Sequence, residues 1–98
     1  MSFAVRVRES VQRQIARWGL PDFLLVEAYL RLTEDLKENP AQRLVRAETP
    51  FDGMVFYFSC VDPDNRFTEH HCYFQVMYAQ DETTLLVVNF GYRRSTGH

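Results

Sequence analysis

Two arginines and a tyrosine near the C-terminus are the residues of this chain best suited to chemistry. Tyr92, Arg93 and Arg94 follow an apolar run that ends at Phe90. A guanidinium group can bind two oxygens of one phosphate or carboxylate, so Arg93 and Arg94 could hold a phosphate group or an acidic partner. Charged side chains at a strand end also keep a sheet edge soluble. The sequence leaves both interpretations open.

Two adjacent histidines form a second candidate group. His70 and His71 stand directly before Cys72 in an apolar run. Neighbouring residues of a strand point to opposite faces, so the two imidazoles cannot share one metal ion without a bend, and we expect no metal and no bound cofactor. One histidine could act as a general base beside Arg66 or Arg93. The alternative is a structural or surface role.

Strand alternation also separates the two arginines. If the last strand continues to Arg94, only one of Arg93 and Arg94 shares the face of Phe90 and Tyr92. A tyrosine on that face could stack on a nucleobase, although aromatic residues of strands more often pack across to the neighbouring strand. Tyr92 is the tyrosine best placed for such binding.

The N-terminal half predicts one strand and two helices to position these residues. Apolar and polar residues alternate over residues 3–8, which is typical of a half-buried strand. Residues 11–18 show helical spacing, and Gly19 suits a left-handed helix end. A second helix is expected over Pro21–Glu38, and Trp18 is expected to anchor the helix pair on the sheet. The apolar stripe predicted to face the sheet consists of Leu25, Tyr29, Leu32 and Leu36.

The C-terminal half predicts an antiparallel meander. Short turns at Asp62–Asn65 and Gln80–Thr83 separate its apolar runs, and Leu44-Val45 could open one further strand. The expected strands are Met54–Val61, His70–Tyr78 and Leu85–Phe90. A helix pair must bury its apolar stripe on one face of such a sheet. The prediction is therefore a two-layer α+β fold in the order β-α-α-β-β-β, with three to four antiparallel strands.

Length and composition limit the kind of protein further. Ninety-eight residues suit a single domain over residues 1–98. No apolar run approaches the roughly 20 residues of a membrane span, and no apolar signal core follows the N-terminus, so a cytoplasmic protein is expected. The formal net charge of −2 argues against a general nucleic-acid binder. Binding of a polyanion would need a local basic patch.

This order of elements and the C-terminal residues resemble the RelE/ParE toxin superfamily. The resemblance is clearest over Tyr73–Arg94. The segment Tyr73-Phe74-Gln75-Val76-Met77-Tyr78 is similar to the family's central strand. The segment that ends in Gly91-Tyr92-Arg93 is similar to its last strand, which finishes with Gly or His, any residue, and Arg.

The resemblance implies a toxin-type protein that binds an antitoxin. RelE-like members are ribosome-dependent mRNA endonucleases that use no metal ion, and the arginine ending the last strand belongs to their site. That role would fall on Arg93, with Arg94 as a second phosphate-binding group. His70, His71 or His98 would move protons.

The chain departs from the active members in several respects, which include its acidic net charge and the lack of a tyrosine after Arg94, and these departures support an alternative. Phe74 stands where many of them carry an arginine, and Lys37 is the only lysine. ParE-like members share the fold, lack the nuclease residues and act on DNA gyrase. The alternative function is therefore a non-catalytic protein-interaction or homodimer module on the same fold.

Overall fold

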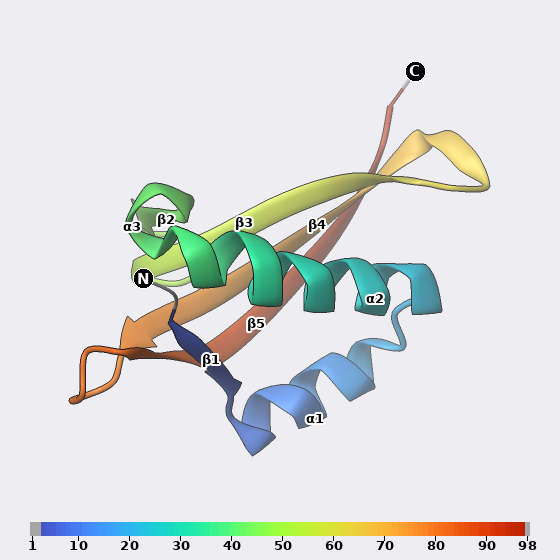
Figure 1. Ribbon diagram of the computed structural model, residues 1–98. Coiled ribbons are helices and arrows are strands. Elements are labelled where there is room, and N and C mark those ends of the chain that lie inside the picture. Colours follow the sequence, from blue (N-terminus) through green and yellow to red (C-terminus); the bar gives the residue numbers. More distant parts are fainter. Residues whose placement is uncertain (1–2, 98) are drawn as a thin grey trace.

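The structure is a computed structural model that describes residues 3–97. Helices cover one face of a five-stranded sheet (Figure 1), so the predicted two-layer α+β architecture is confirmed. The helical segments are α1 (Glu9–Trp18), α2 (Asp22–Leu30), the π-helical turn η1 (Arg31–Leu36) and α3 (Pro40–Arg43). The strands are β1 (Ala4–Val7), β2 (Leu44–Ala47), β3 (Gly53–Asp62), β4 (Asn65–Tyr78) and β5 (Thr84–Thr96).

The sheet has more strands than predicted, and they are of mixed direction. Its order is β1-β5-β4-β3-β2, and β3, β4 and β5 form the predicted antiparallel meander. At one edge β1 pairs with β5 in parallel, and at the other β2 pairs with β3 antiparallel. A parallel pair needs a long crossover connection, which the helices and strands β2, β3 and β4 supply here.

The last two strands are longer than the sequence predicted. β4 begins at Asn65 rather than at His70, and β5 continues to Thr96 rather than ending at Phe90. The added segments pair with each other, for example Glu69 with Ser95. Backbone hydrogen bonds form in a polar strand as well as in an apolar one, so β5 continues through Ser95 and Thr96. Figure 1 shows this part of the sheet projecting past the helices.

The buried side of the second helix also differs from the prediction. Leu24 is fully buried, whereas Leu25 and Tyr29 are 40% and 67% exposed. Leu32 and Leu36 face the core as predicted. Apolar residues occupy nearly every side of α2, so their spacing alone does not mark the side that packs on the sheet.

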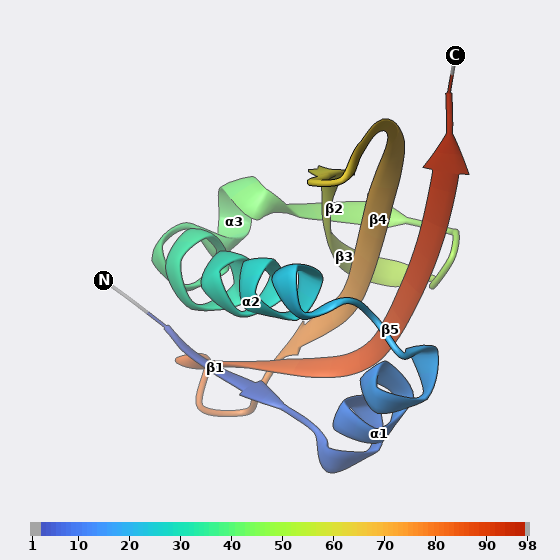
Figure 2. The ribbon, with the colours of Figure 1, turned by 90° about the vertical axis from the view of Figure 1, so that its right-hand side faces the viewer.

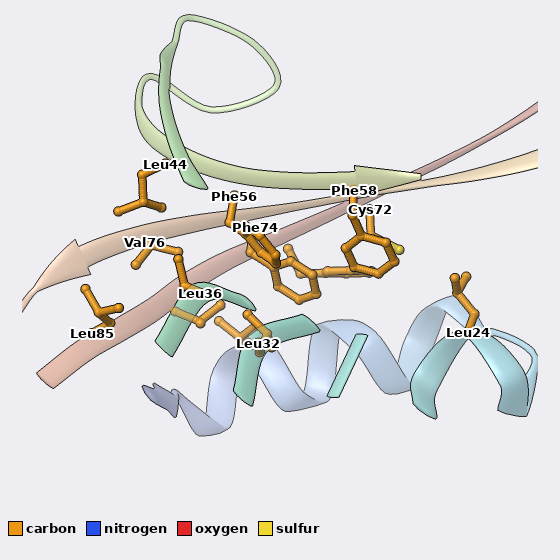
Figure 3. Packing of buried hydrophobic residues seen from close by; sticks show 13 residues of the cluster. Leu24, Leu32, Leu36, Leu44, Phe56, Phe58, Cys72, Phe74, Val76 and Leu85 are labelled. Atoms are coloured by element: carbon orange, nitrogen blue, oxygen red, sulfur yellow. The ribbon is translucent and has the colours of Figure 1, made fainter. Parts of the chain in front are cut away.

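Phe74 lies at the centre of the core between the helices and the sheet. Its ring packs against Phe56, Phe58 and Phe90 from the two neighbouring strands. Leu24, Leu32 and Leu36 approach the same cluster from the helical layer (Figure 3). No helix within residues 3–97 is long and apolar enough to cross a membrane.

Candidate functional site

The two histidines and the two arginines form pairs on opposite faces of the sheet. Across the β4–β5 ladder His70 stands opposite Arg94, and His71 stands opposite Arg93. The ring of His70 contacts Phe23 of α2, so the His70–Arg94 pair lies on the face that carries the helices. The His71–Arg93 pair lies on the other face. Strand alternation predicted this separation of neighbours.

His70 joins Asp62 and Tyr92 into one hydrogen-bonded chain. Its Nε2 lies 2.9 Å from Asp62 Oδ1, and its Nδ1 lies 2.6 Å from the Tyr92 hydroxyl. The three residues come from β3, β4 and β5, which are neighbours in the sheet. His70 is 3% exposed, whereas Tyr92 is only half-buried. Asp62 is half-buried as well, so both ends of the chain are partly accessible and only its middle is buried.

The ionised state of Asp62 determines the direction of the hydrogen bonds that His70 makes. Its hydrogen bond with His70, together with the Asp64 backbone N–H, lowers the pKa of Asp62. An ionised carboxylate only accepts hydrogen bonds, so His70 carries its proton on Nε2 and donates it to Asp62. In the neutral form of His70, Nδ1 then accepts from the Tyr92 hydroxyl.

The order carboxylate, imidazole, hydroxyl is the same as in a Ser-His-Asp triad, with a tyrosine in place of the serine. Burial raises the pKa of Tyr92, so the hydroxyl is protonated at neutral pH, while the positive charge of Arg94 acts in the opposite direction. Tyr92 can pass its proton to His70 as it receives one from a substrate. The Asp62 carboxylate would stabilise the imidazolium that forms.

His71 makes a separate set of hydrogen bonds on the open face. Its Nδ1 lies 2.7 Å from the Tyr57 hydroxyl, and its Nε2 lies 2.9 Å from Ser95 Oγ. Burial and the charge of Arg93 lower the pKa of His71. A neutral His71 therefore links β3, β4 and β5, with a structural role.

A cavity of about 590 Å³ lies at the edge of β5 between the two faces. We call it the aromatic cavity. Figure 2 shows α1 beside β5, the strand that contributes four of the nine lining residues. The lining residues are Trp18, Thr49, Pro50, Phe51, Tyr73, Phe90, Gly91, Tyr92 and Arg93.

Comparison with known proteins identifies the fold. No family model and no curated protein matches the chain. A chain of the toxin–antitoxin complex RelBE2 from Mycobacterium tuberculosis superposes with a TM-score of 0.60 and 17% identity, over 95% of this chain and 100% of that one. The chain has a RelE-like fold. The fold predicted from the C-terminal residues is thus confirmed, and the low identity makes this a divergent example.

The RelE-like fold brings only some of the predicted site residues together. Arg66 lies over the ring of Phe67, 4.9 Å from its centroid, and lines a separate cavity with Glu69 and Ser95. His98 lies outside the described residues. His70, Tyr92 and Arg94 do share one face.

The sequence analysis did not predict two residues of this site, Asp62 and Phe51. Asp62 was predicted only as a turn residue, and its contact with His70 depends on the β3–β4 register. Phe51 reaches the aromatic cavity from a loop distant in sequence. Within residues 3–97, no three side chains of His, Cys, Asp or Glu gather as metal ligands.

Proposed function

We propose that this chain is the toxin-type member of a toxin–antitoxin pair, acts in the cytoplasm and cleaves RNA without a metal ion. The RelE-like fold supports the toxin class, and RelBE2 is itself a toxin–antitoxin complex, so an antitoxin is the expected protein partner. The observation that carries the catalytic part is the Asp62–His70–Tyr92 chain, which ends beside Arg94 on one face.

The reaction would be attack of a ribose 2′-OH on the neighbouring phosphorus. A bond forms from the 2′-oxygen to phosphorus and the bond from phosphorus to the 5′-oxygen breaks, which leaves a 2′,3′-cyclic phosphate and a 5′-hydroxyl. Tyr92 takes the 2′-OH proton as its own proton moves to His70 Nδ1. The 5′-oxygen takes a proton from water.

Arg94 would stabilise the charge that develops on the phosphate oxygens. It follows Tyr92 by two residues on the same face, whereas Arg93 lies on the other side of the strand. In this arrangement Arg94, rather than Arg93, would be the arginine that binds the reacting phosphate. Arg93 lines the aromatic cavity and would bind substrate there.

Induced expression in a bacterial host tests this function. The wild-type chain should arrest growth and degrade mRNA, and Arg94→Gln and Tyr92→Phe should each relieve the arrest and leave mRNA intact. Loss of a positioned electrostatic group in such sites commonly costs about 100-fold or more in rate. Arg46→Gln, which alters an exposed arginine of β2 at the far edge, is the matched control and should stay toxic.

Two results would contradict the proposal. Growth arrest with intact mRNA would indicate another target, as for ParE-like proteins. Arrest that persists in both Arg94→Gln and Tyr92→Phe, with mRNA still degraded, would place the catalytic groups elsewhere.

A second candidate is a non-catalytic interaction or homodimer module. The observation in its favour is an apolar patch on α2, in which four large side chains are 40% to 67% exposed. They are Leu25, Val26, Tyr29 and Leu30. Exposed patches of this kind mark protein interfaces. Harmless expression of the wild-type chain, with a dimer in light scattering that Val26→Glu dissociates, would favour this function.

A further inference from the structure

We propose that the aromatic cavity binds one nucleotide of single-stranded RNA, with the base among the rings and a phosphate on Arg93. This inference deepens the proposed function, because it names the part of the protein that would hold the substrate. It rests on the lining of the cavity, on the charges around it and on the close packing of Phe51 over Gly91.

The lining suits a flat aromatic ligand. Five of its nine residues are aromatic, and they approach from α1, the loop before β3, β4 and β5. Trp18 meets the ring of Tyr92 edge-on, with centroids 5.6 Å apart. Every nucleobase has two π-faces that stack on such rings whatever its sequence. The five rings belong to Trp18, Phe51, Tyr73, Phe90 and Tyr92.

The charges around the cavity select an anionic ligand. No carboxylate lines the cavity, and within residues 3–97 no ion pair occupies Arg93. A second cavity adjoins through Trp18 and Phe90, and its polar lining is Arg17 and Gln14. Each of the two cavities that share Trp18 is thus lined by one arginine, in a chain whose net charge is −2. This is the local basic patch that binding of a polyanion needs.

Gly91 lets Phe51 and Pro50 pack closely over β5 at the cavity. A Cβ atom at this position would lie 3.5 Å from the ring of Phe51 and 3.7 Å from the ring of Pro50, which are ordinary van der Waals contacts. A larger side chain would therefore press on both rings and displace Phe51 from its place in the lining. Gly91→Val is consequently a blocking variant that suits a strand.

Trp18 is the only tryptophan, so its fluorescence reports directly on the cavity. The probe is hexaadenylate with 2′-O-methyl riboses, which lacks the attacking hydroxyl and cannot be cleaved. We expect it to quench Trp18 saturably in the full chain. Adenosine, which has no phosphate, should bind at least tenfold more weakly, and ribose 5-phosphate, which has no base, should not quench.

Three variants complete the design. Gly91→Val should weaken binding of the RNA at least tenfold, and Arg93→Gln should weaken it about tenfold while leaving adenosine binding unchanged. Arg46→Gln, at the far edge of the sheet, should bind as the wild type does. Circular dichroism verifies that each variant is folded, and Arg93→Gln keeps the test decisive if Gly91→Val does not fold.

Three results would overturn the inference. One is equal quenching by ribose 5-phosphate and the RNA. Another is unchanged RNA affinity in folded Gly91→Val or in Arg93→Gln. The third is binding of a hexaglutamate peptide as tight as that of the RNA. This result would assign the cavity to an acidic protein segment.

Tyr92→Phe separates this inference from the proposed function. The variant keeps the ring in the cavity and removes the hydroxyl that contacts His70. It should bind the RNA within threefold of the wild type although it does not cleave. A wild-type chain that binds the RNA but leaves mRNA intact on expression in the bacterial host would refute the catalytic proposal alone. Degradation of mRNA there that Gly91→Val leaves unaffected would refute the cavity alone.

Discussion

His70 and His71 are neighbours in sequence but have separate partners. His70 faces the helices and bonds Asp62 and Tyr92, whereas His71 bonds Tyr57 and Ser95 on the open face. Each has both ring nitrogens occupied, and both rings are buried. The difference in function proposed for them therefore depends on their partners: Tyr92 lines the aromatic cavity, whereas Ser95 lines the separate cavity next to Arg66.

The depressed pKa of His71 predicts a loss of stability in mild acid. Burial first, and the charge of Arg93 second, hold the pKa of His71 below its ordinary value of 6.5. Below pH 6.5 the unfolded chain binds a proton that the folded chain does not, so the free energy of unfolding falls until the folded pKa is reached. His71→Gln does not titrate and should show a flatter profile between pH 7 and pH 5.

Urea unfolding at a series of pH values measures this effect. The acid loss linked to Asp62 falls in a different window, below about pH 4, because the pKa of Asp62 is lowered from 3.8. Parallel profiles of the wild type and His71→Gln from pH 7 to pH 5 would show that His71 is not the group responsible.

At the scale of elements, the turn between α1 and α2 depends on one residue. Gly19 ends α1 with φ of +60°, and its N–H donates to the carbonyl of Ala16. Residues with a Cβ atom adopt this left-handed conformation at a cost. The turn matters for function because Trp18, directly before it, lines the aromatic cavity.

Gly19→Ala should lower the free energy of unfolding by about 1 kcal/mol. Nothing lies within 4 Å of a Cβ atom placed at Gly19, so the cost is purely conformational. Gly19→Asn is the matched control, because asparagine tolerates the left-handed region better. Denaturant melts measure both, and an equal loss in the two variants would point to a steric cause instead.

At the scale of the whole molecule, one aromatic core joins the helices to the sheet. Phe74 has no exposed surface and contacts rings from β3 and β5. The same strands carry the Asp62–His70–Tyr92 chain further along. Packing around Phe74 therefore holds in register the strands that form the site.

Phe74→Ala should lower the free energy of unfolding by about 3 to 5 kcal/mol, because it removes a fully buried ring and leaves a cavity. For a domain of this size each kcal/mol corresponds to about 4 to 8 °C in the melting temperature. Calorimetry of the wild type, Phe74→Ala and Phe74→Leu measures the loss. Leucine fills most of the space, so an equal loss in both variants would contradict the explanation by cavity volume.

The sequence by itself determined the local structure and the opposite orientation of neighbouring residues. The antiparallel meander, the two helices and the separation of Arg93 from Arg94 follow from patterns within a few residues, because backbone preferences and strand alternation act over that range. The resemblance over Tyr73–Arg94 also identified the fold that the comparison later confirmed.

Only the tertiary structure decided which distant residues meet. The parallel pairing of β1 with β5, the contact of Asp62 with His70, and the meeting of Trp18 with Phe51 at the aromatic cavity depend on strand register and loop paths. The tertiary structure also decided which side of α2 is buried. Apolar residues occupy nearly every side of this helix, so only its packing against the sheet selects the buried side. Contacts between distant segments are set by packing of the whole core, which spacing along the chain does not encode.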